Sequence, residues 1–169
     1  MLLPVCVVIR NSGGVFRQAL ELKVPPLALV LLFAVMMWLL STSAPSLALA
    51  LPWRILVALI LWSAGFAIAL AGLFEFRRAK TTVNPLTPEA ASAIVTSGIY
   101  RYSRNPMYVG LLLALIGWGV WLSHLLAFAL LPFFVVYMNR FQIEPEERAL
   151  STKFGGLFRD YRRSVRRWL

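Results

Sequence analysis

Three long runs of apolar residues constrain the fold of this chain more than any other feature of its sequence. They cover residues 24–40, 55–74 and 107–138, and none contains Asp, Glu, Lys or Arg. An α-helix rises about 1.5 Å per residue, so about 20 residues cross a hydrocarbon core of roughly 30 Å. The first two runs therefore predict one membrane-spanning helix each. Because 60% of the residues are hydrophobic, against about 45–50% in soluble domains, an ordinary soluble globule is excluded.

The third run is too long for one membrane-spanning helix. As a single helix, residues 107–138 would reach about 48 Å, which a bilayer accommodates only with strong tilt. Two helices of about 16 residues each, joined by a turn near Ser123 and His124, fit the membrane better. The three runs therefore predict four spans, of which the last two form a helical hairpin.

The basic residues are distributed unevenly between the segments that flank these runs. Segments 1–24, 75–106 and 139–169 hold 3, 5 and 8 Lys and Arg residues, segment 44–54 holds one, and segment 121–125 holds none. With four spans, 16 of the 17 basic residues lie on one side, which the positive-inside rule makes cytoplasmic. Three spans would place the eight C-terminal basic residues outside. We therefore expect a multi-pass protein of a bacterial inner membrane with both termini in the cytoplasm.

The expected fold is an all-α membrane protein of one domain, residues 1–169, with about four transmembrane helices and a C-terminal amphipathic helix. Residues 1–75 form a two-helix part, and residues 76–169 form the part that carries the chemistry. Small residues at helical spacing in the second run, Gly65, Ala69 and Gly72, permit close packing against another helix. The net charge of +10 suits anionic lipid headgroups rather than nucleic acid, because no nucleic-acid-binding motif is present. Cys6 has no companions for a metal site.

The C-terminal tail has the pattern of an amphipathic interfacial helix. From Glu144 onward, apolar residues recur at three- and four-residue steps with arginines between them. The pair Gly155-Gly156 interrupts this pattern and predicts a kink or a break into two helices. The apolar positions are Leu150, Phe154, Leu157, Phe158, Tyr161, Val165 and Trp168.

Two short polar stretches, residues 95–110 and 146–161, carry most of the chemistry and are expected at the same membrane face. In the first, Arg104 could extend to lipid headgroups, Asn105 could cap a helix that starts at Pro106, and the tyrosines could form an interfacial belt. In the second, the adjacent Glu146 and Glu147 could be a solvated first helical turn. Alternatively, each carboxylate could bind a cation or hydrogen-bond donors of a ligand.

Together, the two stretches resemble the isoprenylcysteine carboxyl methyltransferase family and its phospholipid N-methyltransferase relatives. That family has a Thr-x-Gly-x-Tyr turn, Arg-His-Pro-x-Tyr-x-Gly, a helical hairpin, Glu-Glu-x-x-Leu, and Phe-Gly-x-x-Tyr. The resemblance covers about residues 80–169 and rests on two motifs at a matching separation. The matching residues, in order, are Thr96, Gly98, Tyr100, Arg104, Pro106, Tyr108, Gly110, Glu146, Glu147, Leu150, Phe154 and Gly155.

The resemblance implies an integral membrane methyltransferase that uses S-adenosyl-L-methionine at the cytosolic face, without a Rossmann domain, and methylates a lipophilic or amphiphilic substrate. It implies that the cofactor-binding residues are Ser92, Ala93, Ile94, Val95, Tyr100, Asn105, Pro106, Met107, Tyr108 and Glu146. The candidate catalytic residues, of which the two arginines would position the substrate's polar head, are Arg104, Arg140 and Glu147, and the candidate substrate contact is Gln142. No metal is expected.

Two departures from the family pattern affect what the chain can methylate. Asn105 stands where the family has His, so a role that needs imidazole is lost. Gln142 stands where the prenylcysteine enzymes have a substrate-contacting Arg, so a prenylcysteine carboxylate is in doubt, with Arg140 as a possible substitute. The methyl acceptor therefore stays open between a carboxyl or phosphate-linked lipid, a phospholipid amine, and a small thiol or phenol. The alternative from another class is a non-catalytic four-helix membrane subunit or scaffold.

Overall fold

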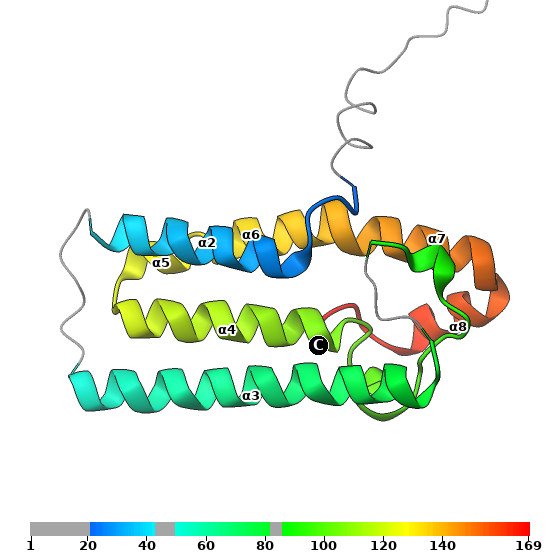
Figure 1. Ribbon diagram of the computed structural model, residues 1–169, viewed down its shortest axis with the longest axis horizontal. Coiled ribbons are helices and arrows are strands. Elements are labelled where there is room, and N and C mark those ends of the chain that lie inside the picture. The colour runs from blue at the N-terminus through cyan, green and yellow to red at the C-terminus, as the bar shows by residue number, and fades with distance from the viewer. Residues whose placement is uncertain (1–20, 43–49, 82–85) are drawn as a thin grey trace, which may run out of the picture.

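The computed structural model describes residues 21–42, 50–81 and 86–169, and every regular element in these residues is helical. The prediction that concerns Cys6 lies outside the described residues, as do residues 1–20, 43–49 and 82–85 as a whole. The long helices lie lengthwise beside one another in a bundle (Figure 1). The helices are α2 (Pro26–Ser41), α3 (Leu51–Arg78), α4 (Pro106–Leu122), α5 (Leu125–Phe128), α6 (Leu131–Tyr137), the π-helical η3 (Met138–Ile143), α7 (Glu144–Phe154) and α8 (Gly156–Ser164), with short 3₁₀ turns η1 (Pro88–Ala90) and η2 (Gly98–Arg101).

Helix α2 corresponds to the first apolar run and packs only one of its faces inside the bundle. Pro26 lies in its first turn, where a missing backbone N–H leaves no helical bond unmade. Its buried side chains include Leu29, Phe33 and Met37, at four-residue steps. Leu27 and Leu31 on the opposite face are about two-thirds exposed. An apolar outer face of this kind is what a lipid-facing helix presents.

Helices α3 and α4 pack backbone against backbone. A Cβ atom added to Gly65 would lie 2.7 Å from the Gly110 carbonyl oxygen, and one added to Gly110 would lie 2.5 Å from the Gly65 carbonyl oxygen. Neither position can therefore carry a side chain at this separation. Farther along, the Trp62 indole Nε1 donates to the Ala114 carbonyl at 3.1 Å. The close packing that small residues in this run permit is present at Gly65.

The predicted hairpin turn is confirmed at Ser123. This residue ends α4 in the left-handed conformation, with φ of 53°, and the chain then reverses into α5. The Arg54 guanidinium donates through Nε to the Trp121 carbonyl at 3.1 Å, which satisfies a carbonyl in the last turn of α4.

The expected length of the second hairpin helix is wrong. Helical structure continues from Leu125 to Phe154, over 30 residues, rather than ending near Met138. Ile143 and Glu144 both have right-handed helical φ and ψ, so Glu144 is not at a free helix start. Pro145 has no N–H to donate to the Phe141 carbonyl, and a π-helical turn, η3, forms just before it. The Leu22 N–H donates to that carbonyl at 3.0 Å instead.

Two helices among the described residues are long and apolar enough to cross a membrane, Leu51–Arg78 and Leu125–Phe154. Helices α2 and α4 are apolar but shorter, with 16 and 17 residues. The apolar run of the second long helix ends at Met138, and Asn139, Arg140 and Gln142 follow it in η3. The helix then continues as α7, which carries Glu144, Glu146, Glu147 and Arg148 within its first five residues. Helix α7 is therefore a polar extension beyond the apolar part of the bundle, as its position in Figure 1 illustrates.

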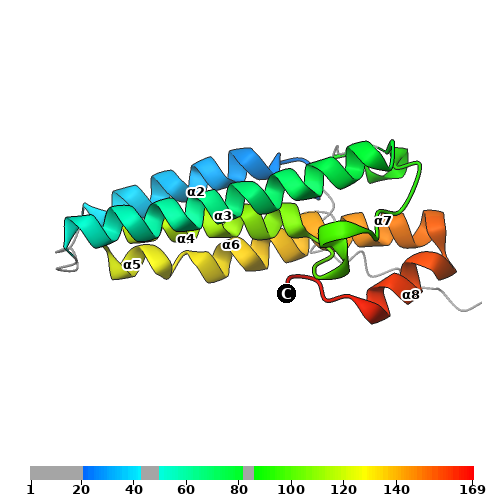
Figure 2. The same cartoon turned by 90° about the horizontal axis from the view of Figure 1, so that it is seen from below.

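The tail breaks into two helices at Gly155, as the sequence predicts. Gly155 has φ of 56°, a conformation that glycine adopts without steric cost, and α8 begins at the next residue. Phe158 and Tyr161 of α8 are buried, whereas Leu157, assigned to the apolar stripe, is 73% exposed. After α8 the chain turns back toward the start of α4, where it ends (Figures 1 and 2).

Candidate functional site

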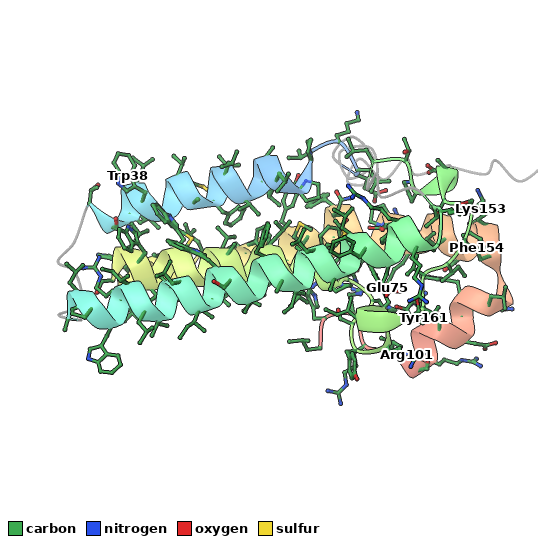
Figure 3. The ribbon with its side chains drawn as sticks, turned by 60° about the horizontal axis from the view of Figure 1, so that its bottom comes forward. Trp38, Glu75, Arg101, Lys153, Phe154 and Tyr161 are labelled. Atoms are coloured by element: carbon green, nitrogen blue, oxygen red, sulfur yellow. The ribbon has the colours of Figure 1, made fainter. Side chains whose placement is uncertain are left out.

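The two polar stretches meet at one end of the bundle. The first forms η2 and the start of α4, and the second forms α7 and α8. Figure 3 shows Tyr161, Glu75 and Arg101 gathered at this end, with Trp38 at the opposite end. The contact is made through the Tyr161 hydroxyl, which donates to the Tyr100 carbonyl at 2.8 Å. Residues about 60 positions apart are therefore joined by a buried hydrogen bond.

Glu147 is the centre of a buried network of ion pairs. Its Oε1 accepts from Arg104 Nη2 at 2.7 Å and from Arg104 Nε at 3.1 Å, and its Oε2 accepts from Arg167 Nη2 at 2.8 Å. The Glu147 side chain is 8% exposed and that of Arg104 is 10% exposed. Burial raises the pKa of the Glu147 carboxyl, but the hydrogen bonds from Arg167 and Arg104 outweigh this effect, and the pKa is lowered. Glu147 is therefore an ionised, fully paired carboxylate.

Glu146 has a different environment although it is the adjacent residue. Its Oε2 accepts a hydrogen bond from the Tyr108 hydroxyl at 3.0 Å, and within the described ranges no Lys or Arg forms an ion pair with it. Burial raises the pKa of the Glu146 carboxyl to about 7; the bond from Tyr108 opposes this rise, and the charge of Glu147 adds to it. The alternative in which Glu146 and Glu147 form a solvated first helical turn does not fit these contacts. Glu147 is buried in ion pairs, and Glu146 forms no ion pair with a Lys or Arg in the part of the chain that the structure describes.

A cavity, here named the loop pocket, lies under residues 86–100. Six of the predicted cofactor-binding residues line it, and the sequence did not predict Phe76, Pro88, Ala91, Leu150, Phe158 or Tyr161 at such a site. The periodicity of the tail placed Phe158 and Tyr161 on the apolar face of an interfacial helix, and that face is the signal that could have found them. The full set of lining residues is Phe76, Pro88, Ala91, Ala93, Ile94, Val95, Tyr100, Arg104, Asn105, Glu146, Glu147, Leu150, Phe158 and Tyr161.

A second cavity, here named the helix groove, lies between the start of α2 and the α3–α4 pair. Its lining is mainly apolar and includes Met107 and Tyr108, which were expected at the cofactor. Ser92 and Pro106, also expected there, line neither cavity. The Ser92 N–H instead donates to Thr81 Oγ1 at 2.9 Å, which ties the loop to the end of α3. The groove is lined by Pro25, Pro26, Leu27, Ala69, Phe76, Leu86, Tyr100, Arg104, Asn105, Met107, Tyr108, Leu111 and Glu146.

The loop pocket and the helix groove share one wall. Five residues line both cavities: Phe76, Tyr100, Arg104, Asn105 and Glu146. Four of them were predicted as site residues from the sequence, and they come from both polar stretches. The shared wall therefore joins the loop pocket, in which charged side chains stand among apolar ones, to the more apolar helix groove.

The other predicted residues lie around this wall. Asn105 precedes α4 but does not cap it; its side-chain Nδ2 donates to the Arg167 carbonyl at 2.9 Å. Gln142 is buried, next to Tyr108. Arg140 is half-exposed, and its Nη1 lies 3.6 Å from a carboxylate oxygen of Glu144. Among the residues that the structure describes, no group of three or more His, Cys, Asp or Glu could hold a metal ion.

The chain has relatives among known proteins. A stretch of 63 residues, 37% of this chain, is 46% identical to an uncharacterised protein of Haemophilus influenzae and covers the whole of that protein. No solved structure matches the chain. The family model of phospholipid methyltransferases matches residues 53–156, more than half of the chain, and this range includes both polar motifs up to Gly155. The family points to a methyltransferase that acts on lipid-type substrates, and the chain belongs to the phospholipid methyltransferase family.

Proposed function

We propose that this protein transfers a methyl group from S-adenosylmethionine to the amine headgroup of a membrane lipid, at the cytoplasmic face of the membrane. The observation that carries the proposal is the wall that the loop pocket and the helix groove share. A methyl transfer needs donor and acceptor held in line and in contact, with water excluded. Two cavities that meet at common side chains support the proposal of such an arrangement.

The residues of the loop pocket fit the cofactor. The ammonium and ribose hydroxyls of S-adenosylmethionine need an anionic acceptor, and the Glu146 carboxylate has no cation among the described residues. Its adenine and its positive sulfonium suit aromatic and apolar walls, which Phe76, Tyr100 and Phe158 supply. The bound cofactor would supply an activated methyl group. Ala93, Ile94 and Val95 would cover it from the loop side and keep water out.

The charges at the shared wall favour an amine as the methyl acceptor. Arg104 is the cation of this wall, and its guanidinium is already bonded to Glu147 and to the Arg162 and Val165 carbonyls, at 3.0 and 2.5 Å. A carboxylate or phosphate acceptor would therefore compete with Glu147 for Arg104. An amine acceptor reacts as its neutral base and does not compete with Glu147 for Arg104. That Arg104, Arg140 and Gln142 contact the substrate stays a prediction.

The helix groove suits the chain of a lipid. Its walls come from the first residues of α2 and from α3 and α4, and Leu27 at the start of α2 is 67% exposed. Because α3 and α4 touch at Gly65 and Gly110, no lipid chain can pass between these two helices at that level. The lipid chain would therefore enter the helix groove from the bilayer, alongside α2. With four spans and cytoplasmic termini, the loop pocket would open to the cytosol, where the cofactor is found.

The proposal is tested with the purified protein in lipid vesicles and methyl-labelled S-adenosylmethionine. Label should pass to a lipid with an amine headgroup and not to a matched lipid with a carboxylate headgroup. For short-chain amines dissolved in the water around the vesicles, each added methylene should lower the apparent KM by about fourfold, since moving one CH₂ out of water contributes about 0.8 kcal/mol. Equal methylation of a short-chain, water-soluble amine would contradict lateral access from the bilayer.

Calorimetric titration of the cofactor in detergent separates this function from the non-catalytic alternative. A scaffold or subunit of a larger complex has no reason to bind S-adenosylmethionine. Absence of binding by the intact protein would therefore overturn the proposed function.

A further inference from the structure

After α8, residues 165–169 pass the start of α4. Val165 has extended backbone angles, with φ of −126° and ψ of 137°. From there the chain runs back from α8 to the start of α4 (Figure 1). Residues 165–168 are named the strap here. The family model ends at residue 156, so the family match says nothing of this segment.

The strap is bonded to three consecutive residues that precede α4. The Ser103 hydroxyl donates to the Arg167 carbonyl at 3.5 Å, the Arg104 N–H donates to the Arg166 carbonyl at 3.0 Å, and Asn105 Nδ2 donates to the Arg167 carbonyl at 2.9 Å. The acceptors are all backbone carbonyls. These bonds therefore depend on where the strap lies and not on the side chains of its own residues.

Two side chains of the strap hold it in that place. Arg167 donates to Glu147 Oε2 at 2.8 Å, and the Trp168 indole N–H donates to Asn139 Oδ1 at 3.0 Å. Glu147 is in α7 and Asn139 is in η3, so both anchors lie on the long helix across the site from α4. The strap thus ties the start of α4 to that helix beside the wall that the two cavities share.

The position of the strap decides how the side-chain amide of Asn105 is oriented at the shared wall. Asn105 is part of the shared wall, and its amide has one donor end and one acceptor end. With Nδ2 committed to the Arg167 carbonyl, Oδ1 is the amide atom that can accept from a ligand ammonium or hydroxyl. We infer that Arg167 is a positioning residue of the cofactor site, which acts through the strap to orient Asn105. This inference rests on the proposed function, because it takes S-adenosylmethionine as the ligand.

The test is a double-mutant cycle on cofactor affinity, measured by calorimetry with the full-length protein in detergent. Arg167→Gln removes the charged anchor, and Asn105→Ala removes the group that the strap orients. Each should weaken S-adenosylmethionine binding about fivefold to tenfold, the effect of about one hydrogen bond. If Arg167 acts through Asn105, the double variant should bind no more weakly than the weaker single variant. Arg167→Lys, which keeps a cation opposite Glu147, should restore most of the affinity.

Arg163→Gln is the matched control, since this arginine of α8 is 83% exposed and pairs only with exposed Asp160 among the described residues. It should leave the affinity unchanged. If Arg167→Gln does not fold, Trp168→Phe removes the other anchor and takes its place in the cycle. Additive losses in the double variant, or wild-type affinity in Arg167→Gln, would overturn the role of the strap. Absence of binding by the wild-type protein would instead overturn the proposed function itself.

Discussion

Arg104 and Glu147, 43 residues apart in the chain, form a buried ion pair with an Nη2–Oε1 distance of 2.7 Å. This pair joins the first polar stretch to the second, and the neighbouring Glu146 forms no ion pair with a Lys or Arg of the described residues. One glutamate is thus committed to holding the end of the bundle together. The other is available to a ligand.

Replacing Arg104 with Gln should strongly destabilise the protein. The substitution removes one of the two arginines bonded to Glu147 and the donor to the Arg162 and Val165 carbonyls. Breaking a buried pair by removing one partner costs about 3–5 kcal/mol. Thermal unfolding in detergent without cofactor measures the effect. The control is Arg163→Gln, whose pair with Asp160 is fully at the surface; similar melting temperatures for both variants would contradict a structural role for Arg104.

Cofactor affinity should depend on pH through Glu146. The pKa of its carboxyl is raised by burial, from 4.5 to about 7, so below pH 7 the group is largely protonated and cannot attract an ammonium. We expect the Kd for S-adenosylmethionine to fall as the pH rises from 6 to 8, and this part of the pH dependence should disappear in Glu146→Gln. At pH 8 the variant should bind about 10- to 150-fold more weakly, because one charge-assisted hydrogen bond is lost.

Two further measurements check that assignment. Asp160→Asn removes a negative charge from a side chain that is 78% exposed and should preserve both affinity and its pH dependence. In the absence of cofactor, the raised pKa means that the folded protein holds a proton that the unfolded chain releases between pH 4.5 and about 7. The free energy of unfolding should therefore decrease as pH rises through this window, and less so in Glu146→Gln. A pH dependence identical in the variant and the wild type would refute the role of Glu146.

Replacing Gly110 with Ala should force α3 and α4 apart. The added Cβ would lie 2.5 Å from the Gly65 carbonyl oxygen, which is backbone and cannot rotate away. Such overpacking costs about 1–3 kcal/mol. Gly156→Ala is the matched control, because a Cβ there meets nothing closer than an arginine side-chain nitrogen at 4.0 Å. The two variants are compared by thermal unfolding in detergent, and an equal stability of both would show that α3 and α4 can separate at no cost.

The expected topology places Ser164, at the end of α8, in the cytoplasm and Pro45 outside. Single cysteines at these two positions, in a Cys6→Ala background, are labelled in intact cells with a reagent that does not cross the inner membrane. Pro45→Cys should react and Ser164→Cys should react only after the cells are opened. Labelling of Ser164→Cys from outside would rule out four spans with cytoplasmic termini.

The sequence predicts local features of this protein well. The helices at the first two apolar runs, the turn at Ser123 and the break at Gly155 follow from apolar run length and from glycine, and all three are present. The sequence predicts the end of the second hairpin helix less well. The end of an apolar run marks where a helix leaves the membrane, and the helix itself can continue beyond that point. Helix α7 is polar yet continues α6 through a π turn, since the Leu22 N–H satisfies the carbonyl that Pro145 leaves without a donor.

For the candidate site, too, the sequence predicts some features and the tertiary structure decides others. The motifs and their separation determined which residues gather at one end of the bundle, because a hairpin of two apolar helices must return the chain to the side from which it started. Only the tertiary structure decided how Glu146 and Glu147 divide their roles, since neighbours in sequence with the same side chain differ only in what packs against them. Arg167 pairs with Glu147 because the strap folds back beside α7, and Phe76 reaches the shared wall because α3 lies against α4. How deeply a side chain is buried, and which groups contact it, depends on segments that are distant in the sequence. A local sequence pattern therefore does not predict it.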